Sequence, residues 1–89
     1  MSYQFVNRPS VKSDLTTAVD YYKSISISLA KQFLFRIREA KTYIAKSPLG
    51  FQVTYKNVRT LLLKQFPYNI HYVVVEQSNL IFILAIIHA

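Results

Sequence analysis

The stretch IHYVVVEQSNLIFILAII, residues 70–87, decides the fold of this chain. Residues 70–75 alternate between two faces and are rich in β-branched and aromatic side chains, which favours a strand. Residues 80–87 are apolar on both faces, as in a strand that lies inside a sheet and is covered on both sides. Gln77, Ser78 and Asn79 separate the two runs, so these strands are expected to pair as an antiparallel hairpin.

The sequence upstream of this hairpin adds further strands. Residues 58–65 are rich in β-formers and are bounded by Phe66, Pro67 and Tyr68, which predicts a three-stranded antiparallel meander over the C-terminal part. The segment 51–57 fits a strand or an ordered loop, and the pattern does not choose between them. The short alternating segment 3–7 predicts an edge-like strand at the N-terminus.

The middle of the chain has helical periodicity. Apolar residues recur at intervals of three and four over residues 9–24 and again from residue 29 to 46, which predicts two amphipathic helices. The serine-rich stretch 24–28 places the turn between them, and the Ser-Pro-Leu-Gly stretch 47–50 ends the second. Asp14 lies near the positive end of the first helix, where a carboxylate is favoured.

Together these elements predict a single α+β domain over residues 1–89. It has an N-terminal strand, an α-helical hairpin and then the three-stranded antiparallel meander, in the order βααβββ, with the helices packed on one sheet face. A helical hairpin covers only one face, although the strand at 80–87 is apolar on both. We therefore expect the other face to be covered by a later piece of chain, another subunit or a partner.

Composition narrows the classes of function. The 89 residues suit one domain, and the formal net charge of +7 favours nucleic acid, the ribosome or an acidic protein segment as partner. The chain has no cysteine and no grouping of His, Asp or Glu at ligand spacing, so we expect no metal and no cofactor. The apolar run at 80–87 is far shorter than the ~20 residues of a membrane span. A soluble, cytoplasmic protein is expected.

Several segments taken together resemble the ParE/RelE toxin superfamily. The most specific is Val58-Arg59 followed by Phe66-Pro67-Tyr68-Asn69-Ile70-His71-Tyr72. The others are Pro9-x-Val11-x-x-Asp14-Leu15, Tyr21-Tyr22, Ala30-x-x-Phe33-x-x-x-Ile37, Ile44-x-x-Ser47-Pro48 and Ile83-x-x-Ile86-x-His88. The resemblance covers nearly the whole chain, in the order of elements that the periodicity predicts.

This resemblance implies a function. Members are basic toxins of bacterial type II toxin–antitoxin systems, of the plasmid-stabilisation type, and are neutralised by a cognate acidic antitoxin that wraps an extended or helical segment around the toxin. ParE-like members inhibit DNA gyrase, whereas RelE-like members cleave mRNA on the ribosome. The expectation is therefore a toxin bound by an antitoxin, with gyrase or the ribosome as target.

The residues that RelE-like members use for cleavage are poorly matched here. The position of one family arginine holds Asn69, and the other arginine and a C-terminal tyrosine fall at or beyond Ala89. The resemblance thus favours ParE-like gyrase inhibition, or reduced activity, and no catalytic residue is assigned. A ribosome-dependent mRNA endonuclease of RelE type and a non-toxic homodimeric interaction module stay as alternatives.

Three cations, one tyrosine and two histidines are the candidate target- or antitoxin-binding residues. The cations suit a phosphate or an acidic partner, Tyr68 suits a solvent-side contact, and the histidines titrate near neutral pH. The ordinary structural alternatives are solvated lysines, a pair between Arg59 and Glu76 or Asp14, and a histidine bonded at a strand end. The six residues are Lys56, Arg59, Lys64, Tyr68, His71 and His88.

Overall fold

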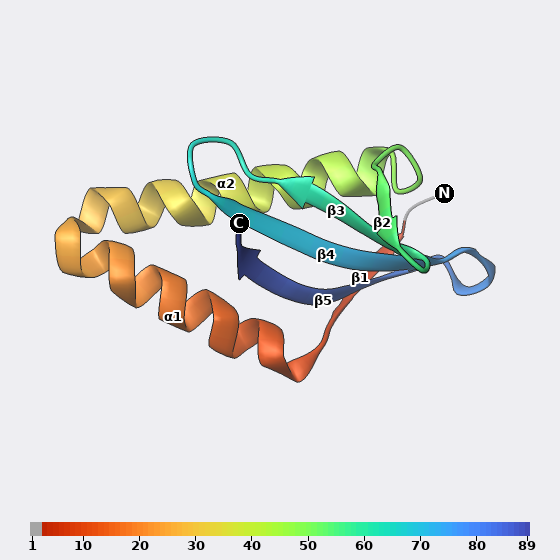
Figure 1. Ribbon diagram of the computed structural model, residues 1–89, viewed down its shortest axis with the longest axis horizontal. Helices are drawn as coiled ribbons and strands as arrows, with labels where there is room; N and C mark the ends of the chain where they lie inside the picture. Colours follow the sequence, from red (N-terminus) through yellow and green to blue (C-terminus); the bar gives the residue numbers. More distant parts are fainter. Residues whose placement is uncertain (1–2) are drawn as a thin grey trace.

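The computed structural model describes residues 3–89 and shows an α+β fold (Figure 1). The elements in chain order are β1 (Gln4–Asn7), α1 (Pro9–Ile25), α2 (Ile27–Lys46), β2 (Val53–Tyr55), β3 (Val58–Leu62), β4 (Tyr68–Val75) and β5 (Leu80–His88). A short 3-10 turn, Glu76–Ser78, connects β4 to β5. The predicted strand, helical hairpin and meander are confirmed, and the undecided segment 51–57 contains the short strand β2.

The five strands form one mixed sheet in the order β1-β5-β4-β3-β2. β1 runs parallel to β5, and the remaining neighbours pair antiparallel. β5 lies between β1 and β4, which agrees with its apolar residues on both faces. β1 is an edge strand, as the sequence predicted.

The strand register separates two faces of the sheet. Tyr72 lies opposite Ile83, and Ile70 lies opposite both Leu61 and Ile86, so these side chains share one face. All of them are buried, together with Phe33 and Ile44 of α2 and Val11 of α1. The core therefore lies between the helical hairpin and this one sheet face.

A single residue joins the two helices. The backbone N–H of Ser26 donates to Tyr22 O at 2.9 Å, and the Ser26 side chain accepts a hydrogen bond from Leu29 N at 3.2 Å. Ser26 thus ends α1 and caps α2, so α2 begins at Ile27 rather than at the predicted Leu29. In Figure 1 the tip of this hairpin projects past the sheet at one end of the long axis.

Two absences apply to residues 3–89. None of the described helices is long and apolar enough to span a membrane. Within the same part of the chain, no three His, Cys, Asp or Glu side chains gather where they would hold a metal ion.

Candidate functional site

The sheet face turned away from the helices, called here the reverse face, carries apolar side chains together with several uncharged polar ones. Val73 lies opposite Phe82 and Val75 lies opposite Leu80, which places these pairs on that face. Following the same register outward gives the rest of the reverse face, none of it charged: Gln4, Val6, Thr54, Tyr55, Val58, Thr60, Leu62, Asn69, His71, Ala85 and Ile87. Both described helices pack on the opposite face.

Two exposed side chains show how open this face is. Leu62 is 61% exposed and Ile87 is 47% exposed, although both are large and aliphatic. Water contact at such side chains is unfavourable by roughly 25 cal/mol per Å². Asn69 lies between them in the register, and large aliphatic side chains exposed together on one face are found at interaction sites. The expectation of an apolar sheet face left open by the helices agrees with the structure.

His71 is a half-buried polar side chain on the reverse face. Its Nδ1 atom is buried and has no hydrogen-bond partner within the described chain. The ring of Tyr55 lies 6.3 Å from the His71 ring. Because a buried polar atom is costly when it has no partner, His71 is suited to accept or donate a hydrogen bond when another molecule covers this face.

Arg59 has partners that differ from those the sequence suggested. Its Nη1 atom donates to the backbone carbonyls of Leu49, at 3.0 Å, and Phe51, at 2.6 Å. The suggested ion pair with Glu76 or Asp14 is wrong, because these two carbonyls accept from the Arg59 guanidinium and Asp14 accepts from the Ile86 N–H. The guanidinium therefore ties the connection between α2 and β2 to β3.

The two lysines of the predicted set lie apart from each other. Lys56 is in the turn between β2 and β3, with a positive φ of 48°. Lys64 follows β3, and its Nζ donates to the Tyr43 hydroxyl at 3.2 Å and lies 5.2 Å from the centre of the Tyr43 ring. These two lysines and Arg59 do not form one phosphate clamp, because each occupies a different position along the β2–β3 hairpin.

Tyr68 and His88 are brought together by the register of β4 and β5. They lie directly opposite each other, with ring centres 5.1 Å apart. Tyr68 also packs on Tyr22 and Phe33, at 6.2 and 5.3 Å, so it is half-buried on the helix-facing side. Both rings line a hollow of about 470 Å³ with Thr17, Tyr21, Tyr22, Ile25 and Pro67.

Tyr22 reports on the polarity of that hollow. Burial raises the pKa of the Tyr22 hydroxyl, and the neighbouring Tyr68 and Tyr21 raise it further. The phenol therefore stays neutral well above physiological pH. The hollow offers hydroxyl groups and ring edges, with no charged side chain among its lining residues.

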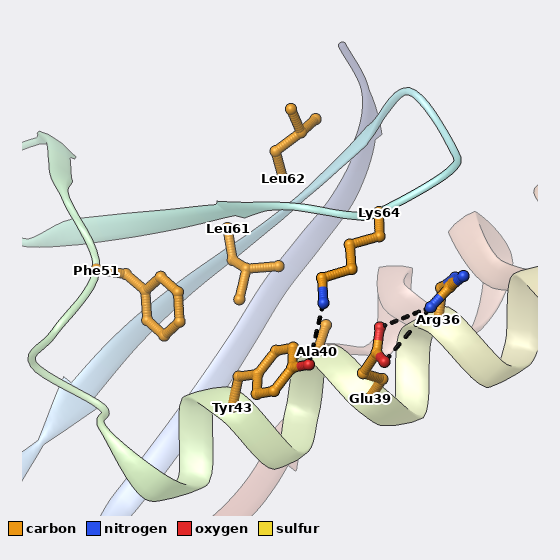
Figure 2. A pocket seen from close by; sticks show the side chains of 8 residues that line it. All are labelled: Arg36, Glu39, Ala40, Tyr43, Phe51, Leu61, Leu62 and Lys64. Atoms are coloured by element: carbon orange, nitrogen blue, oxygen red, sulfur yellow. Dashed lines mark hydrogen bonds and ion pairs between the residues drawn. The ribbon is translucent and has the colours of Figure 1, made fainter.

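A second hollow, which the sequence reasoning missed, lies between α2 and β3 (Figure 2). It encloses about 180 Å³ and has an apolar floor formed by Ala40, Tyr43, Phe51 and Leu61. Charged side chains line its rim: Lys64, and the ion pair between Arg36 Nη1 and Glu39 Oε1 at 3.2 Å. No local signal in the sequence points to it, because its lining residues come from α2, the α2–β2 connection and the β3 region.

Sequence comparison and structure comparison give different results. No family model matches the chain, and no curated protein matches it. Among solved structures, a chain of a chromosomal ParDE TA system from P. aeruginosa superposes with a TM-score of 0.82 at 22% identity, over 98% of this chain and 96% of that one. This chain therefore shares the fold of that solved chain. A chain of the intact E. coli RelBE toxin-antitoxin complex superposes with a TM-score of 0.63 at 11% identity, over the same shares of each chain.

Proposed function

We propose that this ParE/RelE-fold protein is the toxin of a type II toxin–antitoxin module and is neutralised by a cognate acidic antitoxin. The observation that carries the proposal is the end-to-end likeness to a chain of a ParDE system, with a TM-score of 0.82. This support is a likeness of fold over 98% of this chain and 96% of that one, and the residues of the site have to carry the functional argument.

The reverse face and the net charge support an acidic partner. The reverse face carries many apolar side chains and no charged residue, so a partner can cover it without the cost of desolvating ions. The net charge of +7 attracts an acidic chain and speeds its encounter. Lys56, Arg59, Lys64, His71 and the Tyr68–His88 pair are the residues that we assign to antitoxin or target contact.

DNA gyrase is the target that we propose. The ParDE chain superposes better than the RelBE chain, with TM-scores of 0.82 against 0.63. RNA cleavage needs a convergent set of acid, base and phosphate-binding groups. Here Asn69 lies between the aliphatic side chains of Leu62 and Ile87, and the Arg59 guanidinium is engaged by two carbonyls. These observations favour inhibition by binding over ribosome-dependent cleavage.

A homodimer that pairs two reverse faces is the competing use of the same surface. It brings together two chains of net charge +7, which repel each other, whereas an acidic partner removes that repulsion. Light scattering of the isolated chain distinguishes a homodimer from a monomer that awaits an acidic partner. A monomer that forms a complex with the antitoxin is expected, and a stable dimer without a partner contradicts the proposal.

Controlled expression in a bacterial host tests the proposed function. Expression of the chain alone is expected to stop growth, and co-expression of the product of the neighbouring reading frame is expected to restore it. A purified gyrase assay should show loss of DNA supercoiling, while mRNA on translating ribosomes stays intact. Harmless expression contradicts the proposed toxin role. Cleavage of mRNA at ribosomal A-site codons, with gyrase unaffected, contradicts gyrase as the target.

A further inference from the structure

The hollow of about 470 Å³ that Tyr22, Tyr68 and His88 line, called here the tyrosine hollow, has the size of a small-molecule site. Hollows that bind small ligands in proteins enclose about 300–1,000 Å³. Its walls meet at one end of the sheet and come from the C-terminal part of α1, the connection between β3 and β4, and the end of β5 (Figure 1). Because the Tyr68 ring packs on Tyr22 and Phe33, the tyrosine hollow lies on the helix-facing side and is separate from the reverse face.

Tyr22 presents a polar group to this hollow that the chain does not pair. Tyr22 is only 8% exposed, and its ring packs on Phe33 and Phe66, with ring centres 5.3 and 4.9 Å apart. Within residues 3–89 its hydroxyl makes no hydrogen bond, and the hydroxyl oxygen is not fully enclosed, so it opens into the hollow that the side chain lines. Such a hydroxyl gains a hydrogen bond when a polar ligand enters and stays unpaired beside a hydrocarbon.

The polar groups of the tyrosine hollow include both donors and an acceptor. Burial, and after it the nearby Tyr68 and Tyr21, raise the pKa of Tyr22, so the Tyr22 phenol keeps its proton at neutral pH and can donate it. His88 Nδ1 lies 2.9 Å from Ala89 O, an oxygen that only accepts. Nδ1 is therefore the donor, and Nε2 of the neutral His88 ring is an acceptor. A ligand with both an acceptor and a donor matches this pair of groups.

The rings and the absence of charge favour a flat, neutral ligand. Tyr21 meets Tyr22 edge to face, with centres 5.1 Å apart at 73°, and Tyr68 meets His88 at the same distance and angle. Tyr21 is 60% exposed, so a planar ring can stack on it. None of the described lining residues is Asp, Glu, Lys or Arg. A charged ligand would therefore lose hydration in this hollow without gaining a countercharge.

We propose that the tyrosine hollow binds a free purine nucleoside, its base stacked on Tyr21 and its Watson–Crick edge hydrogen-bonded to the Tyr22 hydroxyl and to His88. An adenine base is neutral and planar, and that edge carries a ring-nitrogen acceptor beside an amino donor. A nucleic-acid strand would need cations for its phosphates, which the described lining lacks. This inference goes beyond the proposed function and does not rest on it. It shares only Tyr68 and His88 with the residues assigned to partner contact.

The probe is adenosine, titrated into the ¹⁵N-labelled full chain. We expect saturable shifts of the Tyr21, Tyr22 and His88 amides, with a dissociation constant of about 1 mM or lower. Benzimidazole riboside is the matched control ligand, because it keeps the two fused rings and the ribose but lacks the amino group and the nitrogens of the six-membered ring. It is expected to bind about 10-fold more weakly, since the Tyr22 hydroxyl and His88 then have no partner in the ligand.

Protein variants give a second readout. Tyr22→Phe keeps the buried ring and removes the hydroxyl, so it is expected to weaken adenosine about 10-fold and to leave benzimidazole riboside unchanged. Tyr21→Ala changes an exposed side chain that the fold does not need, and it is expected to weaken both ligands about 10-fold through lost stacking. Tyr43→Phe removes a hydroxyl outside the tyrosine hollow and is the matched control, with adenosine affinity within about two-fold of the native chain.

Several outcomes overturn the inference. They are no saturable shift up to about 5 mM adenosine, shifts confined to the reverse face, equal affinity for adenosine and benzimidazole riboside, or a short adenine RNA that binds more than about 100-fold tighter than adenosine. If the product of the neighbouring reading frame forms a complex while adenosine does not bind, the nucleoside proposal fails and the toxin assignment stands. If adenosine binds as expected while expression is harmless and no complex forms, the toxin assignment fails and the nucleoside proposal stands.

Discussion

The carboxylate of Asp14, on α1, accepts a hydrogen bond of 3.1 Å from the backbone N–H of Ile86, on β5. β1 pairs with β5 only over residues 80–83, so beyond Ile83 the outer edge of β5 has no neighbouring strand in the described chain. The helix-terminal role expected of Asp14 is therefore not the one observed, because α1 has no acidic residue in its first turn. Asp14 instead closes this outer edge of the sheet.

We predict that Asp14→Ala lowers the free energy of unfolding by about 1–3 kcal/mol, because the part-buried Ile86 N–H then loses its acceptor. Asp14→Asn keeps an oxygen acceptor and is expected to lose less. Urea unfolding of both variants, with amide exchange at Ile86, measures the difference. Equal stability of the alanine variant and the native chain contradicts a role for this bond.

Tyr72 is predicted to make stability fall at alkaline pH. Its hydroxyl donates to Pro48 O at 2.7 Å, and burial raises the pKa of Tyr72 to about 12, while the positive charge of Arg59 acts in the opposite direction. Between the unfolded value of about 10 and the folded value, the unfolded state releases the proton first. The stability contribution is therefore complete below pH ~10 and is lost as pH rises toward ~12.

Tyr72→Phe isolates this effect from that of the other tyrosines and lysines. At neutral pH the variant is expected to lose about 1 kcal/mol, since the Pro48 carbonyl loses its donor. Above pH ~10 the difference in unfolding free energy between the two proteins should become smaller, because only the native chain has a Tyr72 hydroxyl that ionises. A gap that stays constant from neutral to alkaline pH contradicts the assignment.

Lys56 occupies a backbone conformation that suits glycine. Its φ of 48° lies in the left-handed region, where a non-glycine residue costs roughly 1–2 kcal/mol. Lys56→Gly is expected to raise the free energy of unfolding by up to about 1 kcal/mol, because the entropy of glycine in the unfolded chain offsets part of the gain. Thermal unfolding measures this, and a lower melting temperature for the glycine variant contradicts it.

Arg59 is predicted to stabilise the connection between α2 and β2 by geometry as well as charge. Arg59→Lys keeps the charge, but the shorter lysine side chain does not bring its ammonium to the position of Nη1, the atom that donates to both carbonyls. We expect a loss of about 1–2 kcal/mol and faster amide exchange at Thr60, whose N–H donates to Gln52 O. Arg59→Met should lose more. If Arg59→Lys has the same stability and the same Thr60 amide exchange as the native chain, then the charge alone accounts for the effect of Arg59.

Local patterns were enough to predict most of the fold. The apolar run at 80–87 placed β5 between two other strands, and the intervals of three and four located both helices, because these signals depend on periodicity within one element. The single-residue junction at Ser26 was not predictable, since serines at 24, 26 and 28 are equally good caps by composition. β2 was undecided because its side chains are all exposed and carry no burial pattern.

The candidate site was less accessible to sequence reasoning. Tyr68 and His88 were both selected, but only the register of β4 and β5 shows that their rings meet. The partners of Arg59 are backbone carbonyls, which leave no trace in side-chain identity. The hollow between α2 and β3 depends on how α2 packs against the sheet, a tertiary feature that no local pattern encodes.

The most direct test of the account measures partner binding at the reverse face. Purified chain is titrated calorimetrically with the product of the neighbouring reading frame, using Val73→Glu on the reverse face and Val53→Glu on β2 as its matched control. A one-to-one complex is expected, weakened about 30-fold or more by Val73→Glu and little changed by Val53→Glu. Absence of a complex, or equal affinity for both variants, contradicts the claim that this apolar face binds the antitoxin.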